Sequence, residues 1–256
     1  MDAQRNKSRL RGCIVVVACT AAAATAVAVP GAQTGPRRFS EAQIFVELNH
    51  TDSDLGLHAS IDGESWTRLE IEGPGELPLL NLFSRGRLSA QGLTQLAFES
   101  AEPPFEELSP AQFFRRFPEG RYEIEARAQD GAEIESVAFL SHVLAAPPEN
   151  VLVSGMPAAE NCDAALPQVH PPVVIDWDPV TTSHPDVGKR GPVTIANYQL
   201  FVERPGVLFS LDLPRGVTRV EVPELVTSRG EEFKFEIIAR TTRGNNTAVE
   251  SCFRLF

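Results

Sequence analysis

The chain runs through Val173-Val174-Ile175-Asp176-Trp177-Asp178-Pro179, then Tyr198-Gln199-Leu200-Phe201-Val202, and then Phe233-Lys234-Phe235-Glu236-Ile237-Ile238-Ala239. Each of these runs alternates large apolar residues with polar ones, which is the period of a β-strand with one buried face and one wet face. Turn-forming Pro, Gly and Asn residues lie between the runs. The C-terminal part of the chain is therefore predicted to be an all-β domain.

The aromatic residues in these runs resemble those of strands B, C and F in a fibronectin type III domain, and the resemblance covers about residues 167–256. In that family the Trp of strand B and the Tyr of strand C pack together between two sheets. The resemblance thus implies that Trp177 and Tyr198 are core neighbours and that Phe233 is a third core residue. Because Phe233 stands where the family usually has a Tyr, the hydroxyl's hydrogen bond to the preceding turn is expected to be lost.

The N-terminal part, residues 41–147, also has the pattern of a sandwich made of short strands. Two hairpins are predicted, one turning at Asp62-Gly63 and one turning at Asp130-Gly131, because both dipeptides favour tight turns. A short helix is predicted from Ser109, where Ser and Gln112 have the spacing of a capping box and Pro110 takes the first helical position. Its apolar stripe is Phe113, Phe114 and Phe117.

The predicted fold is all-β, with two tandem β-sandwiches of the immunoglobulin or fibronectin III type and one short helix in the first. The Pro-rich run 145–150 breaks the strand pattern and marks the boundary. The predicted organisation is a signal peptide at 1–28, a flexible leader at 29–40, an N-terminal sandwich at 41–147 and a fibronectin type III-like domain at 148–256.

The first 28 residues read as a secretory signal. Four basic residues precede an apolar run from Cys13 to Val29, and Ala26-Val27-Ala28 provides the small residues that a signal peptidase recognises. Cleavage would leave a secreted or periplasmic bacterial protein with no other segment that inserts into a membrane. Two alternatives remain open: Cys19 follows a loose lipobox and could be a lipidated N-terminus, or the 17-residue apolar run is retained as an anchor.

Two cysteines, Cys162 and Cys252, remain outside the signal, and they flank the C-terminal domain. An even pair in an oxidising compartment predicts a disulfide. Closing a loop of that length stabilises the fold by about 4 to 5 kcal/mol in the chain-entropy model. The alternative is two unpaired buried thiols.

The chain is acidic, and it becomes more so after export. The full sequence has 23 basic and 34 acidic residues; removing residues 1–28 takes away four of the former and Asp2, which leaves 19 and 33 and a net charge of −14. Binding to nucleic acid and to anionic membranes depends on Lys and Arg that neutralise phosphates. The charge therefore argues against both kinds of partner.

One loop, residues 49–58, has the residue types of a calcium site. Asn49, Asp52 and Asp54 are oxygen donors on a Gly-containing turn, although their spacing is not that of an EF-hand. Glu99 and Glu102 could complete the site if the fold brings them near. The alternative is that the Asn and Asp side chains only bond their own backbone as turn formers.

Signatures of catalysis are missing from the sequence: there is no Gly-x-Ser-x-Gly, no His-Glu-x-x-His and no phosphate-binding Gly loop, and the five histidines lack metal-ligand spacing. The leading hypothesis is an exported, non-enzymatic binding or adhesion module whose partner is a protein or a glycan, with calcium as the one candidate cofactor. The alternative is a secreted hydrolase or its accessory subunit, with a calcium-assisted site in the N-terminal domain. A pocket with convergent His and carboxylates would favour the enzyme.

Overall fold

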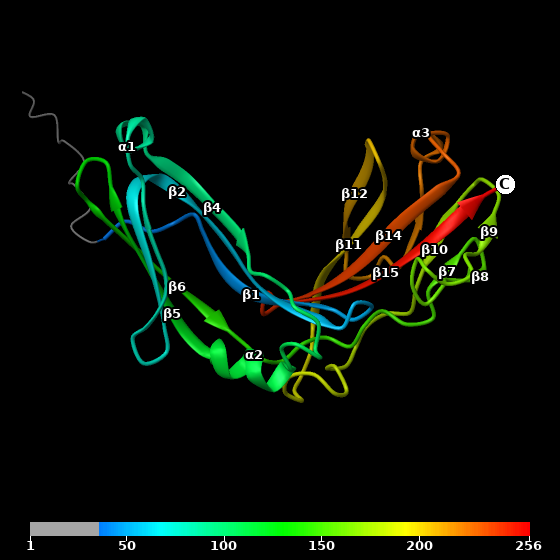
Figure 1. Cartoon of the computed structure of the whole chain (residues 1–256), viewed down its shortest axis with the longest axis horizontal. Helices are drawn as coiled ribbons and strands as arrows, with labels where there is room; N and C mark the ends of the chain where they lie inside the picture. Colours follow the sequence, from blue (N-terminus) through cyan, green and yellow to red (C-terminus); the bar gives the residue numbers. More distant parts are fainter. Residues whose placement is uncertain (1–35) are drawn as a thin grey trace, which may run out of the picture. The chain divides into compact units, whose positions relative to one another are not determined.

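The structure is a computed structural model that describes residues 36–256 (Figure 1). The predicted signal peptide, the candidate lipidation site Cys19 and the leader up to residue 35 lie outside the described residues. Between residues 36 and 256, no helix combines the length and the apolar character needed to cross a membrane.

The N-terminal sandwich is organised around one very long strand. This strand, β2 (Asp54–Gly73), has 20 residues, and its two halves pair with different strands of one large sheet. The first half pairs with β1 and β4, and the second half pairs with β3 and β5, to which β6 is added. The partners are β1 (Glu41–Asn49), β3 (Leu77–Phe83), β4 (Leu93–Glu99), β5 (Gly120–Ala128) and β6 (Glu133–Leu140).

The continuity of β2 corrects the hairpin predicted at Asp62-Gly63. The chain does not reverse there; β2 continues through an irregularity in its pairing with β4 between Asp62 and Trp66, after which it pairs with β3 and β5. Gly63 does not form a turn. It leaves room for the Phe39 ring, from which a Cβ at position 63 would be only 2.9 Å away. Asp-Gly is only a local turn signal, and here the two halves of β2 find separate partners.

The second predicted hairpin is present. Strands β5 and β6 pair antiparallel from Gly120 opposite Leu140 to Arg127 opposite Glu133, and the chain turns at Asp130-Gly131, where Gly131 has a φ of 86°. Tyr122, Ile124 and Ala126 are buried on one face of β5, as the alternation predicts.

The C-terminal sandwich has two sheets in the order that an immunoglobulin-like or type III fold requires. One sheet has the order β13-β10-β7-β8, and the other contains β12-β11-β14-β15 with β9 parallel to β15. The strands are β7 (Leu152–Val153), β8 (Met156–Pro157), β9 (Gln168–Val169), β10 (Val174–Asp176), β11 (Ile195–Arg204), β12 (Val207–Pro214), β13 (Arg219–Glu221), β14 (Glu232–Thr241) and β15 (Asn246–Leu255).

Between residues 36 and 256, three short helices interrupt the strands: α1 (Arg87–Gln91), α2 (Pro110–Arg116) and α3 (Glu224–Thr227). Helix α2 is the predicted one, and its capping box between Ser109 and Gln112 is formed. Its Phe113 is fully buried, which confirms the core role of that stripe. Helices α1 and α3, which have only five and four residues, are not predicted by the sequence pattern.

The buried apolar residues form two clusters, and the chain passes from one to the other between Leu144 and Ala145. This is close to the predicted boundary at 147. That the two parts are independent domains stays a prediction, because Val187 from the C-terminal part packs in the first cluster. Residues 36–40 are not a loose leader: Arg37 pairs with Ile134, and Phe39 is buried in the first cluster.

The predicted core of the C-terminal sandwich is confirmed. Trp177 and Tyr198 meet edge to face with ring centroids 5.5 Å apart, and Phe233 stacks on Phe253 at 5.4 Å. The Tyr198 hydroxyl accepts a hydrogen bond of 2.8 Å from the backbone N–H of Val180. The buried Tyr198 hydroxyl therefore has a hydrogen-bond partner.

A hydrogen bond of the kind that Phe233 cannot make is formed by a Tyr in the N-terminal sandwich. Tyr122 lies near the start of β5, and its hydroxyl donates to the Pro118 carbonyl at 2.9 Å. A Tyr that bonds back to the backbone a few residues upstream is the tyrosine corner of immunoglobulin-like sandwiches. The N-terminal sandwich therefore contains this corner, which the Phe at position 233 excludes from strand β14 of the C-terminal sandwich.

The two sandwiches are joined through backbone pairing. Residues Glu47–Asn49 of β1 run parallel to Asn246–Ala248 of β15, which makes one sheet that extends from β12 to β6. Asn245, which precedes β15, is only 1% exposed. Its side chain donates to the Ser141 and Val143 carbonyls and accepts from the Val46 N–H, at 2.7, 3.1 and 3.0 Å.

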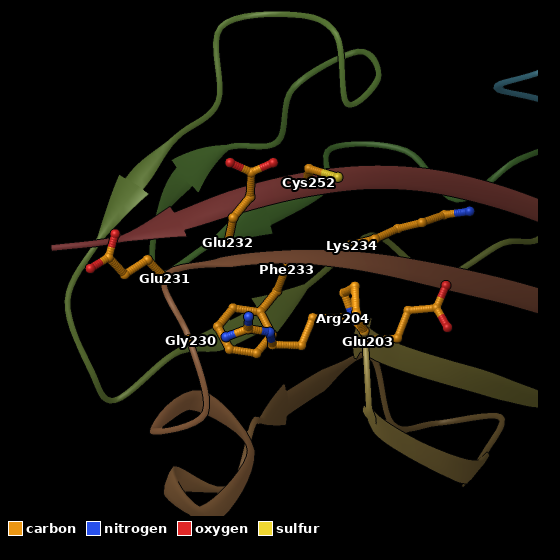
Figure 2. A pocket seen from close by; sticks show the side chains of 9 residues that line it. Glu203, Arg204, Gly230, Glu231, Glu232, Phe233, Lys234 and Cys252 are labelled. Carbon is orange, nitrogen blue, oxygen red and sulfur yellow. The ribbon is translucent and has the colours of Figure 1, made fainter.

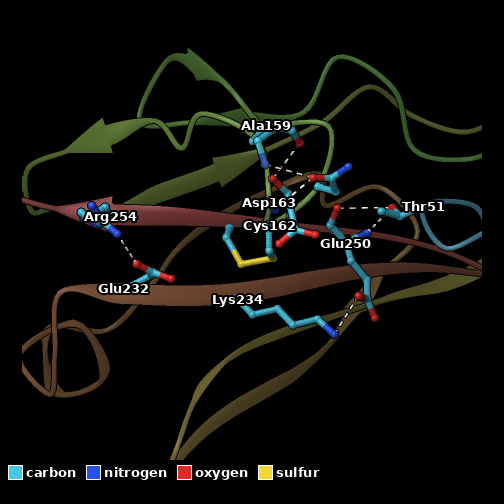
Figure 3. Close-up of a disulfide and its surroundings, with 12 residues drawn as sticks. Thr51, Ala159, Cys162, Asp163, Glu232, Lys234, Glu250 and Arg254 are labelled. Carbon is cyan, nitrogen blue, oxygen red and sulfur yellow. Dashed lines mark hydrogen bonds and ion pairs between the residues drawn. A yellow bond between two sulfur atoms is a disulfide. The ribbon is translucent and has the colours of Figure 1, made fainter.

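The predicted disulfide between Cys162 and Cys252 is present, with a Cα–Cα distance of 4.9 Å (Figure 3). The disulfide links the loop before β9 covalently to β15. Ser251 adds a second fastening, because its hydroxyl donates to the Ala159 carbonyl at 2.8 Å.

Candidate binding face on the large sheet

One face of the large sheet, on strands β12-β11-β14-β15-β1-β2-β4, carries side chains that belong to neither hydrophobic cluster. Strand alternation and the pairing register put these side chains on the same side. We call this surface the outer face. It is formed by Leu208, Ser210, Asp212, Gln199, Phe201, Glu203, Lys234, Glu236, Ile238, Arg240, Asn246, Glu250, Phe45, Glu47, Asp54, His58 and Glu99.

Where β1 meets β15, the outer face carries a stacked column that links the two sandwiches. The His58 ring stacks on Phe45 with centroids 5.2 Å apart, and the Arg240 guanidinium lies 5.2 Å from the centre of the same Phe45 ring. A chain of hydrogen bonds follows, because Arg240 Nε donates to Asn246 Oδ1 and Asn246 Nδ2 donates to Glu47 Oε2 at 2.6 Å. The centre of the face is therefore a positioned aromatic and polar network.

Glu102 is brought to this column from the loop after β4. Its Oε1 lies 3.1 Å from His58 Nε2, and it occupies the space beside Gly56, where a Cβ would be 1.6 Å from the same oxygen. Burial alone lowers the pKa of His58, but the hydrogen bond to Glu102 and the charges of Glu47 and Glu99 raise it overall. The arrangement favours a cationic imidazole.

Acidic side chains gather around Asp54 at the start of β2. Burial raises the pKa of Asp54 to about 6, and repulsion from Glu102, Asp52 and Glu250 adds to this effect. The sequence suggests that Glu102 could complete a site in the 49–58 loop. Glu102 does lie near this loop, because Asp54 pairs with Pro104 in an isolated bridge. Glu99 lies opposite His58 in the strand register.

Glu236 on β14 is the most perturbed carboxyl of the outer face. Burial raises its pKa to about 8, and the charges of Glu47 and Glu250 contribute in the same direction. Glu250 lies directly across from Glu236 in the register and forms an ion pair with Lys234, whose Nζ is 2.7 Å from Glu250 Oε2 (Figure 3). Glu236 thus keeps a proton near neutral pH.

The pKa of Glu236 predicts that stability falls as the pH rises. Its folded pKa lies above the ordinary value of 4.5, so the folded protein binds more protons than the unfolded chain between about pH 4.5 and 8. Glu236→Gln keeps the shape and stays neutral, and we expect its thermal midpoint to exceed the wild-type value at pH 8 to 9 and to match it near pH 4.5. Differential scanning calorimetry across this range measures the effect. Glu221→Gln, at an exposed position on β13, is the control and should change nothing.

The loop residues predicted to bind calcium are held in a local turn. Asn49 Oδ1 accepts the N–H groups of Thr51 and Asp52, and Asn49 Nδ2 donates to Asp52 Oδ2 at 3.2 Å. These are the bonds of the turn-forming alternative. The turn is also tied to β15, because the Glu250 N–H donates to Thr51 Oγ1 at 2.8 Å (Figure 3). Among residues 36–256, no group of three or more His, Cys, Asp or Glu side chains has the geometry to hold a metal ion.

Calcium binding by this loop stays a prediction, and a melting curve tests it. A cation would screen Asp54 from its acidic neighbours and bind only the folded state, so calcium at one hundred times its Kd would add about 2.7 kcal/mol to the unfolding free energy. Asp52→Asn together with Asp54→Asn should remove this gain. Identical curves in millimolar calcium and in chelator would leave turn formation as the role of these residues.

A surface hollow of about 880 Å³ lies where the β11–β12 hairpin approaches β14 and Cys252 (Figure 2). It brings together Glu203, Arg204, Glu232 and Lys234, and the Arg204 guanidinium lies over the Phe233 ring at 5.9 Å. With Glu231, three carboxylates and two cationic side chains line the hollow.

No family model matches the chain, and no curated protein does. Solved structures do match: the FN1–FN3 domains of chicken CNTN1 are 8% identical with a TM-score of 0.35, and the match covers 86% of this chain and 65% of that one. A two-domain fibronectin type III segment of chicken tenascin is 12% identical with a TM-score of 0.28, covering 84% of this chain and 98% of that one.

A tetra-tandem repeat from the extending region of a large adhesion protein is also similar, at 12% identity and a TM-score of 0.28. That match covers 84% of this chain and 50% of the other, so this chain spans about half of the adhesin structure and less than two thirds of the CNTN1 structure. The fold assignment rests on the strand pairing and the cores described above.

Proposed function

We propose that this chain is an exported, non-enzymatic binding module that recognises a partner protein through the outer face. The observation that carries the proposal is the continuity of this face across both sandwiches, with the column of His58, Phe45 and Arg240 at its centre. A flat array of strands that presents aromatic and charged side chains is suited to contact with another macromolecule.

The charges on the outer face favour a partner that presents Lys or Arg. Glu99 and Glu203 are exposed near its two ends, and Asp54 and Glu47 lie between them. Opposite charges on two proteins steer their encounter and raise the association rate, an effect that salt weakens. An acidic face also disfavours acidic glycans, so a protein is the better of the two partner classes considered.

The experiment is capture of surface material from the native source on the immobilised chain, followed by treatment of that material with protease or with periodate. We expect protease to abolish capture, periodate to leave it unchanged, and rising salt to weaken it. Periodate-sensitive, protease-resistant capture would instead identify a glycan partner.

Charge reversal locates the contact. Glu99→Lys with Glu203→Lys changes the outer face in both sandwiches, and we expect at least a tenfold loss of affinity, about 1.4 kcal/mol. The matched control is Glu135→Lys with Glu221→Lys, two exposed carboxylates on β6 and β13. Equal binding by both double variants would place the contact elsewhere.

Export is part of the proposal, and the disulfide supports it because such bonds persist in oxidising compartments. Intact mass of the exported chain is expected to correspond to residues 29–256 with two hydrogens fewer than the reduced form. Alkylation without reductant should add nothing to that mass. Two alkylated thiols would show that Cys162 and Cys252 are not bonded in the exported protein, and a retained N-terminus would show that the signal is not removed.

A further inference from the structure

Strand β12 ends the large sheet and pairs on one side only. Its eight residues align with β11 from Val207 opposite Arg204 to Pro214 opposite Asn197, without any shift of register. An edge of this kind presents backbone N–H and C=O groups that can pair with another strand. Within the described part of the chain, no strand occupies that edge.

The side chains of β12 do not protect the edge. Edge strands usually carry Lys, Pro or a bulge that discourages further pairing. The strand has a single charge, Asp212, and its one Pro, Pro214, is its last residue and lies outside the run from Leu208 to Asp212; Leu208 and Leu211 are 65% and 36% exposed. The equivalent edge of the N-terminal sandwich, β3, is protected: it contains Pro78 and has an irregularity in its pairing beside that residue.

The outward backbone groups of β12 follow from the hairpin that starts it. A two-residue loop, Pro205-Gly206, joins Arg204 to Val207, so these two residues form a hydrogen-bonded pair. Hydrogen-bonding direction alternates along a strand. The N–H and C=O groups of Val207, Phe209 and Leu211 therefore point to β11, and those of Leu208, Ser210 and Asp212 point to the free edge.

We propose that β12 pairs with β12 of a second copy of this chain, antiparallel, about a two-fold axis that passes beside Ser210. In this register Ser210 faces Ser210 of the second copy, and Leu208 faces Asp212. All three outward residues of each copy then form hydrogen-bonded pairs with the other copy. The interface is isologous, so it closes as a dimer and does not propagate.

The sequence of β12 is nearly symmetric about Ser210, and this symmetry argues for a second copy over an unrelated strand. On the side that faces the hydrophobic cluster, Phe209 lies opposite Leu211 of the other copy and Val207 lies opposite Leu213. Every cross-strand pair on that side is apolar, which stabilises an antiparallel pair. On the other side Asp212 faces Leu208, so the two Asp212 carboxylates do not face each other.

Charge repulsion and the buried surface area determine the affinity of the dimer. Glu203 lies across β12 from Asp212 of the second copy, two strand spacings or about 10 Å away, and this repulsion is largely screened at about 0.15 M salt. One strand pair buries less surface than a standard interface of about 1,600 Å². We therefore expect a dimer with a micromolar Kd that tightens as salt is raised, whereas the outer-face contact proposed above weakens.

Sedimentation velocity of the full exported chain over a concentration series tests the proposal. We expect a monomer–dimer equilibrium that Ser210→Pro weakens about tenfold or more, because Pro removes the outward N–H at the two-fold axis and leaves the bonds to β11 in place. Ser210→Ala keeps that N–H and should dimerise. Leu77→Lys, at a 58% exposed position on the protected edge β3, is the matched control and should also dimerise.

Cysteine pairs test the register and remain informative if Ser210→Pro does not fold. After mild oxidation, Ser210→Cys should give a covalent dimer, Leu208→Cys alone should not, and Leu208→Cys mixed with Asp212→Cys should give a heterodimer. A chain that stays monomeric at all concentrations would overturn the proposal. A dimer that Ser210→Pro leaves intact, or a cross-link by Leu208→Cys alone, would overturn it as well.

Discussion

Replacing Trp177 by Ala is expected to lower the free energy of unfolding by about 3 to 5 kcal/mol, because the indole is buried and its removal leaves a cavity. Trp177 is 3% exposed and packs edge to face on Tyr198, whose hydroxyl holds the Val180 N–H. The loss therefore reaches two more residues of the same core. Chemical denaturation followed by circular dichroism measures it.

Phe139→Ala is the control for this variant. Phe139 is a large aromatic residue on β6, but it is 70% exposed, so we expect a change within about 0.5 kcal/mol. If Trp177→Ala lowers the free energy of unfolding no more than Phe139→Ala does, the Trp177 side chain does not stabilise the core. The same measurement shows whether the N-terminal sandwich keeps its own transition when Trp177 is removed, as the predicted boundary at 147 implies.

Asn245→Ala is expected to have an effect of similar size for a different reason. The substitution leaves the Val46 N–H and the Ser141 and Val143 carbonyls without their present partner in a buried place. Each buried backbone group left unpaired costs about 1 to 3 kcal/mol. Since these groups come from β1 and from the segment after β6, the variant should also loosen the junction between the sandwiches, and hydrogen exchange at Val46 should become faster.

Asn246→Ala is the matched control. Asn246 is as buried as its neighbour, but it bonds the side chains of Arg240 and Glu47, which can turn towards water when it is lost. We expect a smaller loss and unchanged exchange at Val46. If Asn245→Ala is no more destabilising than Asn246→Ala, the junction does not depend on the three backbone bonds.

The sequence predicts best what depends on neighbouring residues. The alternation around Trp177 and Phe233, the capping box at Ser109 and the Asp130-Gly131 hairpin are local patterns, and all are found in the structure. The prediction of a hairpin at Asp62-Gly63 also relies on a local pattern, and it is wrong. A dipeptide reports the local preference for a turn, and it does not report that the two halves of β2 pair with β4 and β5.

The candidate site was harder to predict because its parts are distant in sequence. Glu102 reaches His58 across 44 residues, and Asn245 reaches Val46 across 199. Gly244-Asn245-Asn246 has the residue types of a turn, but nothing local shows that Asn245 points into the junction. The Tyr122 corner did carry a usable signal, since a Tyr stands two residues after Gly120 at the start of a clear strand.

The parallel pairing of β1 with β15 has a mechanical consequence. If the protein is pulled through residues 36 and 256, the load enters at the beginning of β1 and leaves at the end of β15, so the two strands are dragged past each other along their length. The hydrogen bonds between Glu47–Asn49 and Asn246–Ala248 then share the load and must break together. Since rupture under tension is governed by the unfolding barrier, this seam would resist force better than strands that can be peeled apart one bond at a time.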